Sequence, residues 1–288
     1  MKKILLGTVL VASAMFAKVS TIVPYAGYIN YDNNQQKSIK DSAKFGGLYV
    51  SKGDLSYLLE FSYTYLDIKY KDSSISDLKQ HDVFLAYSKY YPKFMIKGGI
   101  HYINNNDNID LGGGETAIFA IGGYNWFGYN KLSYGLETYY SYYSDGKDEN
   151  NLQKNVGVAQ ITPYISYSKA ININTRNIIS LKVNYIYAKD YMKKNYTSFE
   201  VSDTLYYKKF YASVKYYDGE MRSGVKDGGM NVYNTLDLMK NGGGVKLGYY
   251  IKPRLTMDVS YDINNFKEHN LVTDGGNSVA VLSLSYSY

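Results

Sequence analysis

Apolar and polar positions alternate with a period of two over most of the chain beyond residue 20. In residues 55–65, one face carries Leu55, Tyr57, Leu59, Phe61, Tyr63 and Tyr65, and the other Ser56, Leu58, Glu60, Ser62 and Thr64. Because strand side chains alternate between two faces, this period predicts β-strands. We expect strands at residues 21–31, 43–50, 55–65, 80–90, 93–102, 116–127, 132–142, 156–167, 179–187, 197–207, 210–217, 244–251, 255–263 and 277–288.

The connections between these strands alternate between long and short. The short connections include residues 51–54, 91–92, 128–130, 208–209 and 252–253, whereas the longest is 218–243. Bacterial transmembrane barrels sort their connections in this way, with short periplasmic turns and longer external loops. We therefore predict an all-β fold, a transmembrane antiparallel up-and-down β-barrel of about fourteen strands, with twelve or sixteen as alternatives.

Two residues interrupt the expected alternation. Pro163 lacks an N–H for the ladder inside an expected strand, and Asp203 places a charge on a face that should meet lipid. A β-bulge beside either residue would restore the pattern.

The first seventeen residues have the pattern of a secretory signal peptide. Lys2 and Lys3 precede an apolar run at residues 4–16, and small residues follow. Cleavage after Ala17 or after Ala14 fits the sequence. We expect residues 18–288 to form a single barrel domain, held together without disulfides because the chain has no Cys.

The last twelve residues, NSVAVLSLSYSY, place Leu282, Leu284, Tyr286 and Tyr288 on one face. This stretch resembles the C-terminal strand of Gram-negative outer-membrane β-barrel proteins. The resemblance implies export to the cell outer membrane, recognition of these four residues by the barrel insertion machinery, and closure of the barrel against the first strand. A soluble β-sandwich is the alternative. In size, strand number and lack of a plug, the chain also resembles small monomeric porins of the OmpG type, which implies a monomer.

Aromatic residues support a membrane location. Tyr accounts for 36 of 288 residues, and aromatic side chains gather at both membrane interfaces of such barrels. We expect one girdle near the short turns, at Tyr87, Phe94, Trp126, Tyr167, Tyr207, Phe210, Tyr249 and Tyr288, and another near the long loops, at Tyr65, Tyr102, Tyr142, Tyr187 and Tyr261.

The face opposite the lipid is predicted to line a pore. Its ionisable positions are Glu60, Asp82, Lys97, His101, Glu137, Lys182, Glu200, Lys215, Lys246, Asp258 and Asp262. Such a wall suits passive diffusion of ions and small hydrophilic solutes, and charges of both signs predict weak ion selectivity. We expect no metal, cofactor or catalytic residue.

Other functions fit the sequence less well. The three histidines, His81, His101 and His269, have no partner at the spacing that an outer-membrane lipase or protease would need, so we expect no enzyme. A fatty-acid transporter would need an N-terminal plug for which few residues precede the first strand. The net charge of +6 is spread along the chain and predicts no nucleic-acid partner. A closed structural or adhesive barrel acting through its external loops remains the alternative.

The longest connection, residues 218–243, combines glycines with the apolar residues Met230, Val232, Tyr233, Leu236, Leu238 and Met239. Folded inward, it would bury apolar surface and act as a lid that hinges at its glycines. Alternatively, it is an external hairpin that extends its two strands.

Overall fold

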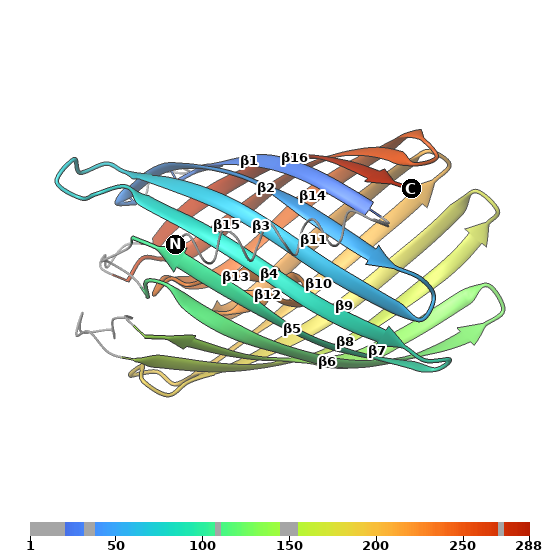
Figure 1. The fold of residues 1–288 in the computed structure, drawn as a ribbon, viewed down its shortest axis with the longest axis horizontal. Coiled ribbons are helices and arrows are strands. Elements are labelled where there is room, and N and C mark those ends of the chain that lie inside the picture. Colours follow the sequence, from blue (N-terminus) through green and yellow to red (C-terminus); the bar gives the residue numbers. More distant parts are fainter. Residues whose placement is uncertain (1–20, 32–37, 107–110, 145–154, 270–273) are drawn as a thin grey trace.

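The computed structural model describes residues 21–31, 38–106, 111–144, 155–269 and 274–288. These residues form a closed antiparallel barrel in the order β1-β16-β15-β14-β11-β10-β9-β8-β7-β6-β5-β4-β3-β2 (Figure 1). The strands are β1 (Thr21–Asn30), β2 (Lys40–Gly53), β3 (Tyr57–Tyr70), β4 (Leu78–Tyr90), β5 (Phe94–Asn105), β6 (Gly114–Phe127), β7 (Asn130–Tyr143), β8 (Val156–Asn172), β9 (Thr175–Ala188), β10 (Asn195–Tyr207), β11 (Phe210–Met221), β14 (Leu238–Lys252), β15 (Leu255–Lys267) and β16 (Asp274–Ser287). The predicted all-β barrel and its fourteen strands are confirmed.

The connections are sorted by length as predicted. Those of two or three residues, such as 208–209 between β10 and β11 and 253–254 between β14 and β15, lie at the right-hand end of the barrel in Figure 1. The longer connections lie at the opposite end. By analogy with known transmembrane barrels, we expect the short-turn end to face the periplasm.

The outer surface of the barrel is apolar. Alternate side chains of each strand point outward, and most of these are aliphatic or aromatic. On β10, for example, Val201 and Leu205 are exposed while Ser202 and Thr204 between them are partly buried. Of the aromatic residues expected in the two girdles, all but Tyr65 and Tyr249 are among the exposed large side chains.

Strand β3 begins two residues later than predicted. Leu55 lies in the turn before it and is 99% exposed. The cause is Asp54, whose carboxylate accepts hydrogen bonds from the backbone N–H of Ser56 at 2.6 Å and of Tyr57 at 3.1 Å. These bonds lower the pKa of Asp54, and they form a local turn that competes with the ladder.

Several strands extend further at the long-loop end than predicted. β11 reaches Met221 and β14 begins at Leu238, so the connection between them is residues 222–237. The added pairing contains a register shift between Asp218 and Met221, beside Gly219, whose φ is +108°. A bulge of this kind bends a strand at the rim of a barrel.

A bulge, which would have restored the pattern beside Pro163 or Asp203, is found at neither residue. The β8–β9 register is the same on both sides of Pro163, since Ile161 pairs with Tyr185 and Tyr164 with Lys182. The β10 register is continuous through Asp203, whose carboxylate instead accepts a hydrogen bond of 2.5 Å from the Asn177 amide on β9. A polar neighbour therefore accommodates the outward charge without a change of register.

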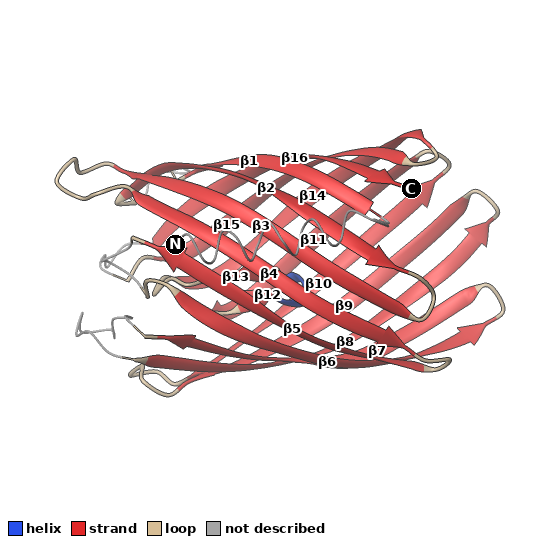
Figure 2. Ribbon diagram, viewed as in Figure 1, coloured by secondary structure: helices blue, strands red, loops and turns tan. Residues whose placement is uncertain are grey.

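Residues 222–237 enter the barrel instead of extending above it. They contain β12 (Val225–Lys226), the 3₁₀ turn η2 (Asp227–Gly229) and β13 (Asn231–Val232), which form a two-stranded sheet of their own (Figure 2). No helix in the described part of the chain is long and apolar enough to cross a membrane.

The closing contact suggests a test of assembly. β1 pairs with β16 from Thr21↔Ser287 to Asn30↔Ser278, and the Thr21 and Ser287 hydroxyls lie 3.0 Å apart. Deleting Ser287 and Tyr288 shortens this last pairing, so folded, heat-modifiable protein in the outer membrane should fall severalfold on unboiled gels. Tyr261→Ser, which removes an exposed aromatic side chain from β15, should assemble nearly normally. Equal assembly of the deletion and the wild type would contradict the role assigned to the chain end.

Candidate pore constriction

The structure places the sequence-predicted ionisable residues on inward-facing positions of the wall. Asp82, Glu200, Lys215, Lys246 and Asp262 line the larger luminal cavity, and Asp258 lines a second one. Glu60, Lys97, Glu137 and Lys182 form ion pairs within the wall, and His101 contacts the inserted segment. Their function as a pore lining stays a prediction.

Acidic and basic wall residues are brought together in pairs. The Lys97 ammonium lies 2.8 Å from the Glu60 carboxylate, and three further pairs are Lys215–Asp262 at 2.9 Å, Lys246–Asp258 at 3.6 Å and Lys182–Glu137 at 3.8 Å. Each of the four predicted basic residues thus has an acidic partner. The lumen therefore presents paired charges instead of a zone of one sign.

Gly244 makes room for one of these pairs. It lies in register between Lys215 on β11 and Asp262 on β15, and a Cβ at Gly244 would overlap the Asp262 carboxylate. Gly242 is similarly covered by the ring of Tyr217. The expectation that glycines 242–244 act as a hinge was wrong, because these residues lie inside a continuous β-ladder.

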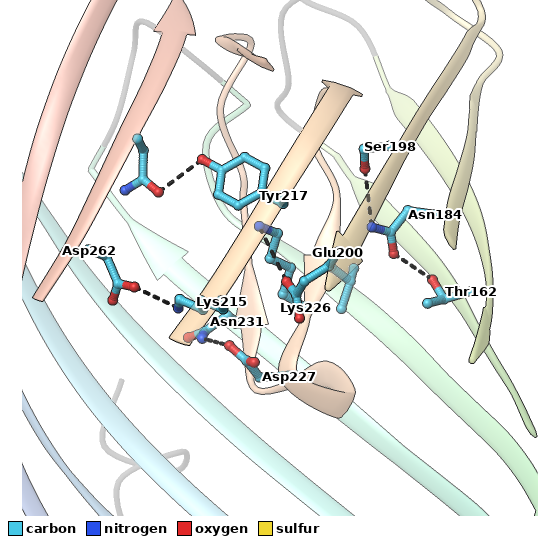
Figure 3. A network of polar contacts seen from close by, with 12 residues as sticks. Thr162, Asn184, Ser198, Glu200, Lys215, Tyr217, Lys226, Asp227, Asn231 and Asp262 are labelled. Atoms are coloured by element: carbon cyan, nitrogen blue, oxygen red, sulfur yellow. Dashed lines mark hydrogen bonds and ion pairs between the residues drawn. The ribbon is translucent and has the colours of Figure 1, made fainter. Parts of the chain in front are cut away.

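The inserted segment is a short hairpin that turns inside the barrel. Val225 pairs with Val232 and Lys226 with Asn231, and the turn between them has positive φ at Asp227, Gly228 and Gly229. At Gly229 a Cβ would collide with Ile118 of β6, so only glycine permits this approach to the wall. Figure 3 shows Lys226 of the hairpin directed toward Glu200 of the wall, at 3.9 Å.

Two polar side chains of the wall bind the backbone of the hairpin. The Gln160 amide on β8 donates to the Val225 carbonyl at 2.8 Å and accepts from the Val225 N–H at 2.7 Å. It therefore satisfies both backbone groups of that residue, as a neighbouring strand would. On β5, His101 Nδ1 lies 2.8 Å from the Gly229 carbonyl, so this nitrogen must carry the proton to donate.

Apolar contacts hold the same segment against the wall. Val225 is buried with Phe84, Ala86, Ile118 and Tyr139, and Met230 and Val232 pack on this cluster. Nearer the long-loop end, Leu236 is fully buried in a larger cluster that also contains Leu238 and Met239. Of the two alternatives left open by the sequence, residues 222–237 take the inward fold, and their action as a lid stays a prediction.

The anchors described here were missed by the sequence analysis. Gln160 and Gln80 occupy inward-facing positions of their strands, but the sequence analysis assigned no role to either. Gln80 accepts a hydrogen bond of 2.9 Å from the Asn234 amide. Their parity was readable from the sequence, whereas their partners, 65 and 154 residues away along the chain, were not.

The remaining space in the lumen lies on one side of the hairpin. A cavity of about 650 Å³ lies between the hairpin and the wall formed by β10, β11, β14–β16 and β1–β4, and a second of about 480 Å³ lies toward the short turns. Lys246 lines both cavities, so they adjoin at its side chain. The described residues contain no group of three or more His, Asp or Glu side chains that could hold a metal ion.

The histidines have separate environments. His81 faces outward, and its Nδ1 lies 2.8 Å from the Tyr63 hydroxyl. The His269 backbone N–H donates to Asp237, beside the Lys40–Asp237 ion pair of 2.6 Å near the long loops. His101 donates a hydrogen bond to the Gly229 carbonyl of the hairpin.

Comparisons with known proteins show what this fold resembles. No protein-family model matches the chain, and no curated protein matches it. Among solved structures, the CymD monoaromatic hydrocarbon channel aligns with a TM-score of 0.56 at 6% identity, over 94% of this chain and 89% of that one. The NanC porin aligns with a TM-score of 0.51 at 12% identity, over 93% and 100% of the two chains. The outer-membrane protein Omp33 of Acinetobacter baumannii gives 0.51 at 11% identity, over 94% and 99%.

At these identities the likeness is one of fold. The chain has the closed antiparallel architecture of Gram-negative outer-membrane β-barrel proteins. The comparisons do not single out the OmpG type, which stays a prediction.

The Gln160 anchor can be tested by single-channel recording. Gln160→Ala leaves the two backbone groups of Val225 without their partners, which costs about 1–3 kcal/mol when such groups are buried. The hairpin should then move within the lumen, and open-channel current should flicker more than in the wild type. Ser166→Ala on the same strand removes a hydroxyl bonded to Ser180 at 2.8 Å and should leave the current quiet. A quiet Gln160→Ala channel would show that this anchor is dispensable.

Proposed function

We propose that this protein is a porin-like channel of the cell outer membrane that allows passive diffusion of ions and small hydrophilic solutes. The observation that carries the proposal is the pair of adjoining cavities that meet at Lys246. Together their linings run from Ser287, close to the short turns, to Phe266 and Asn277, close to the long loops. A solute that follows this route passes between the hairpin and the wall.

The polarity of the route supports hydrophilic solutes. Near the short turns its lining includes the hydroxyls of Thr204, Ser213, Thr256 and Ser285, and further along it meets the Lys215–Asp262 pair. Hydroxyls and charged groups can replace part of a solute's hydration shell, which lowers the cost of entering a narrow passage.

Location and assembly form part of the proposal. An outward surface of aliphatic and aromatic side chains suits lipid, and residues 1–17 would direct export and be removed. The partners are outer-membrane lipid, the barrel insertion machinery and the permeating solutes, and the functional unit is a monomer. The solved structures of similar fold are a channel, a porin and an outer-membrane protein, which supports a transport function over catalysis.

Ion selectivity should be weak, because the lumen charges are paired. In planar bilayers with a salt gradient, the wild-type reversal potential should lie close to zero. Lys246→Glu replaces the positive partner of Asp258 at the junction of the two cavities and should shift the reversal potential toward cation selectivity. Lys209→Glu makes the same charge change in the exposed β10–β11 turn and should have a much smaller effect.

The same recordings test the proposed function. Folded barrels that never conduct would contradict a channel and favour a closed structural or adhesive barrel. Strong selectivity in the wild type would instead mean that the paired wall charges do not set the field.

A further inference from the structure

One side of the larger cavity is unusually apolar for a wall that faces water. Two neighbouring rows of inward side chains cross β16, β1, β2 and β3 in register. One row is Val279, Ile29, Ala43 and Ile68, and the other is Val281, Gly27, Phe45 and Leu66. The Phe45 ring lies over Gly27, where any Cβ would collide with it. The two rows form a flat apolar surface, which we call the apolar patch.

Part of the apolar patch faces the cavity, whereas Ala43 and Ile68 are buried in the apolar cluster that contains Leu236. Val279, Val281, Phe45 and Leu66 all line the cavity and are all partly exposed. Aliphatic groups left in contact with water lose about 25 cal/mol per Å² relative to burial. The wall therefore gains free energy whenever an apolar surface covers it.

Polar groups of the same cavity begin directly beside the apolar patch, because Asp262 on β15 pairs in register with Val279. These groups are the Lys215–Asp262 pair, Lys226 with Glu200, and a hydrogen bond from the Asn231 amide to Asp227 (Figure 3). These groups can bind hydroxyls. Because Lys215 and Lys226 each have an acidic partner within 4 Å, an anionic solute gains little there.

We propose that this cavity is a binding site for an uncharged aromatic compound that carries hydroxyl groups. The ring lies flat on the apolar patch, where Phe45 offers an offset-stacked or edge contact, and the hydroxyls face the paired charges. An ordinary saccharide would leave the patch wet, and a bare hydrocarbon would leave the polar side without partners. This inference rests on the proposed function, since the solute must enter the lumen to bind.

Two glucosides that differ only in the aglycone test the site. Phenyl β-D-glucoside has the aromatic ring and methyl β-D-glucoside lacks it, while both are neutral and hydroxylated. Single-channel block by each is titrated in planar bilayers, and binding to the detergent-folded barrel is measured by calorimetry. The phenyl compound should bind about tenfold more tightly, as expected when one face of a ring is buried. Equal affinities would overturn the proposal and leave a general saccharide passage.

A double variant localises the effect. Val279→Thr with Val281→Thr keeps the side-chain shape but adds two hydroxyls to the apolar patch, so phenyl glucoside should bind severalfold more weakly and methyl glucoside unchanged. Val259→Thr makes the same change on the lipid face of β15 and is the control. Heat-modifiability on gels verifies that each variant is folded. Undiminished phenyl glucoside binding by the folded double variant would overturn the assignment to this patch.

The two measurements separate this proposal from the channel function. Conductance without preferential binding of phenyl glucoside would leave the channel and remove the site. Calorimetric binding by a barrel that does not conduct would support the binding site and contradict the channel function.

Discussion

The structure depends on closure of the backbone hydrogen-bond ladder between β1 and β16. In a bilayer every backbone N–H and C=O needs a partner within the protein, so an open sheet with two free edges would be very unfavourable. Closure also assigns each residue to one of two environments, because successive side chains point outward to lipid or inward to the lumen. A slip of one residue would exchange these faces along a whole strand, which is why register is strongly specified here.

A closed barrel of fourteen strands has a wide interior, and residues 222–237 fill part of it. A wall of this size encloses more space than its own side chains fill. The inserted hairpin occupies part of that space and is bound to one side of it, through Gln160 on β8 and His101 on β5. The free volume consequently lies against β10, β11, β14–β16 and β1–β4. The shape of the candidate passage thus follows from where the hairpin is anchored.

The charges of the lumen follow the same geometry. Lys215 and Asp262 meet across β14 because Gly244 between them has no side chain. Lys97 and Glu60 meet across β4, where the inward-facing residue between them, Ala86, is small. Paired charges cost less to hold in a narrow space than isolated ones.

The sequence by itself determined the features that depend on neighbouring residues. The period-two alternation predicted the strands and the face of each wall residue, and the alternating connection lengths predicted the barrel, since both properties are local. Tertiary structure decided the rest. The apolar residues of 222–237 indicated burial, but their direction depended on Gln160 and His101, 65 and 128 residues away. Glycines 242–244 suggested a hinge from composition, yet across the strands they accommodate Tyr217 and Asp262. The sequence does not distinguish a glycine that acts as a hinge from one that makes room for a neighbouring side chain. The difference depends on side chains of other strands, which only the closed barrel brings beside the glycine.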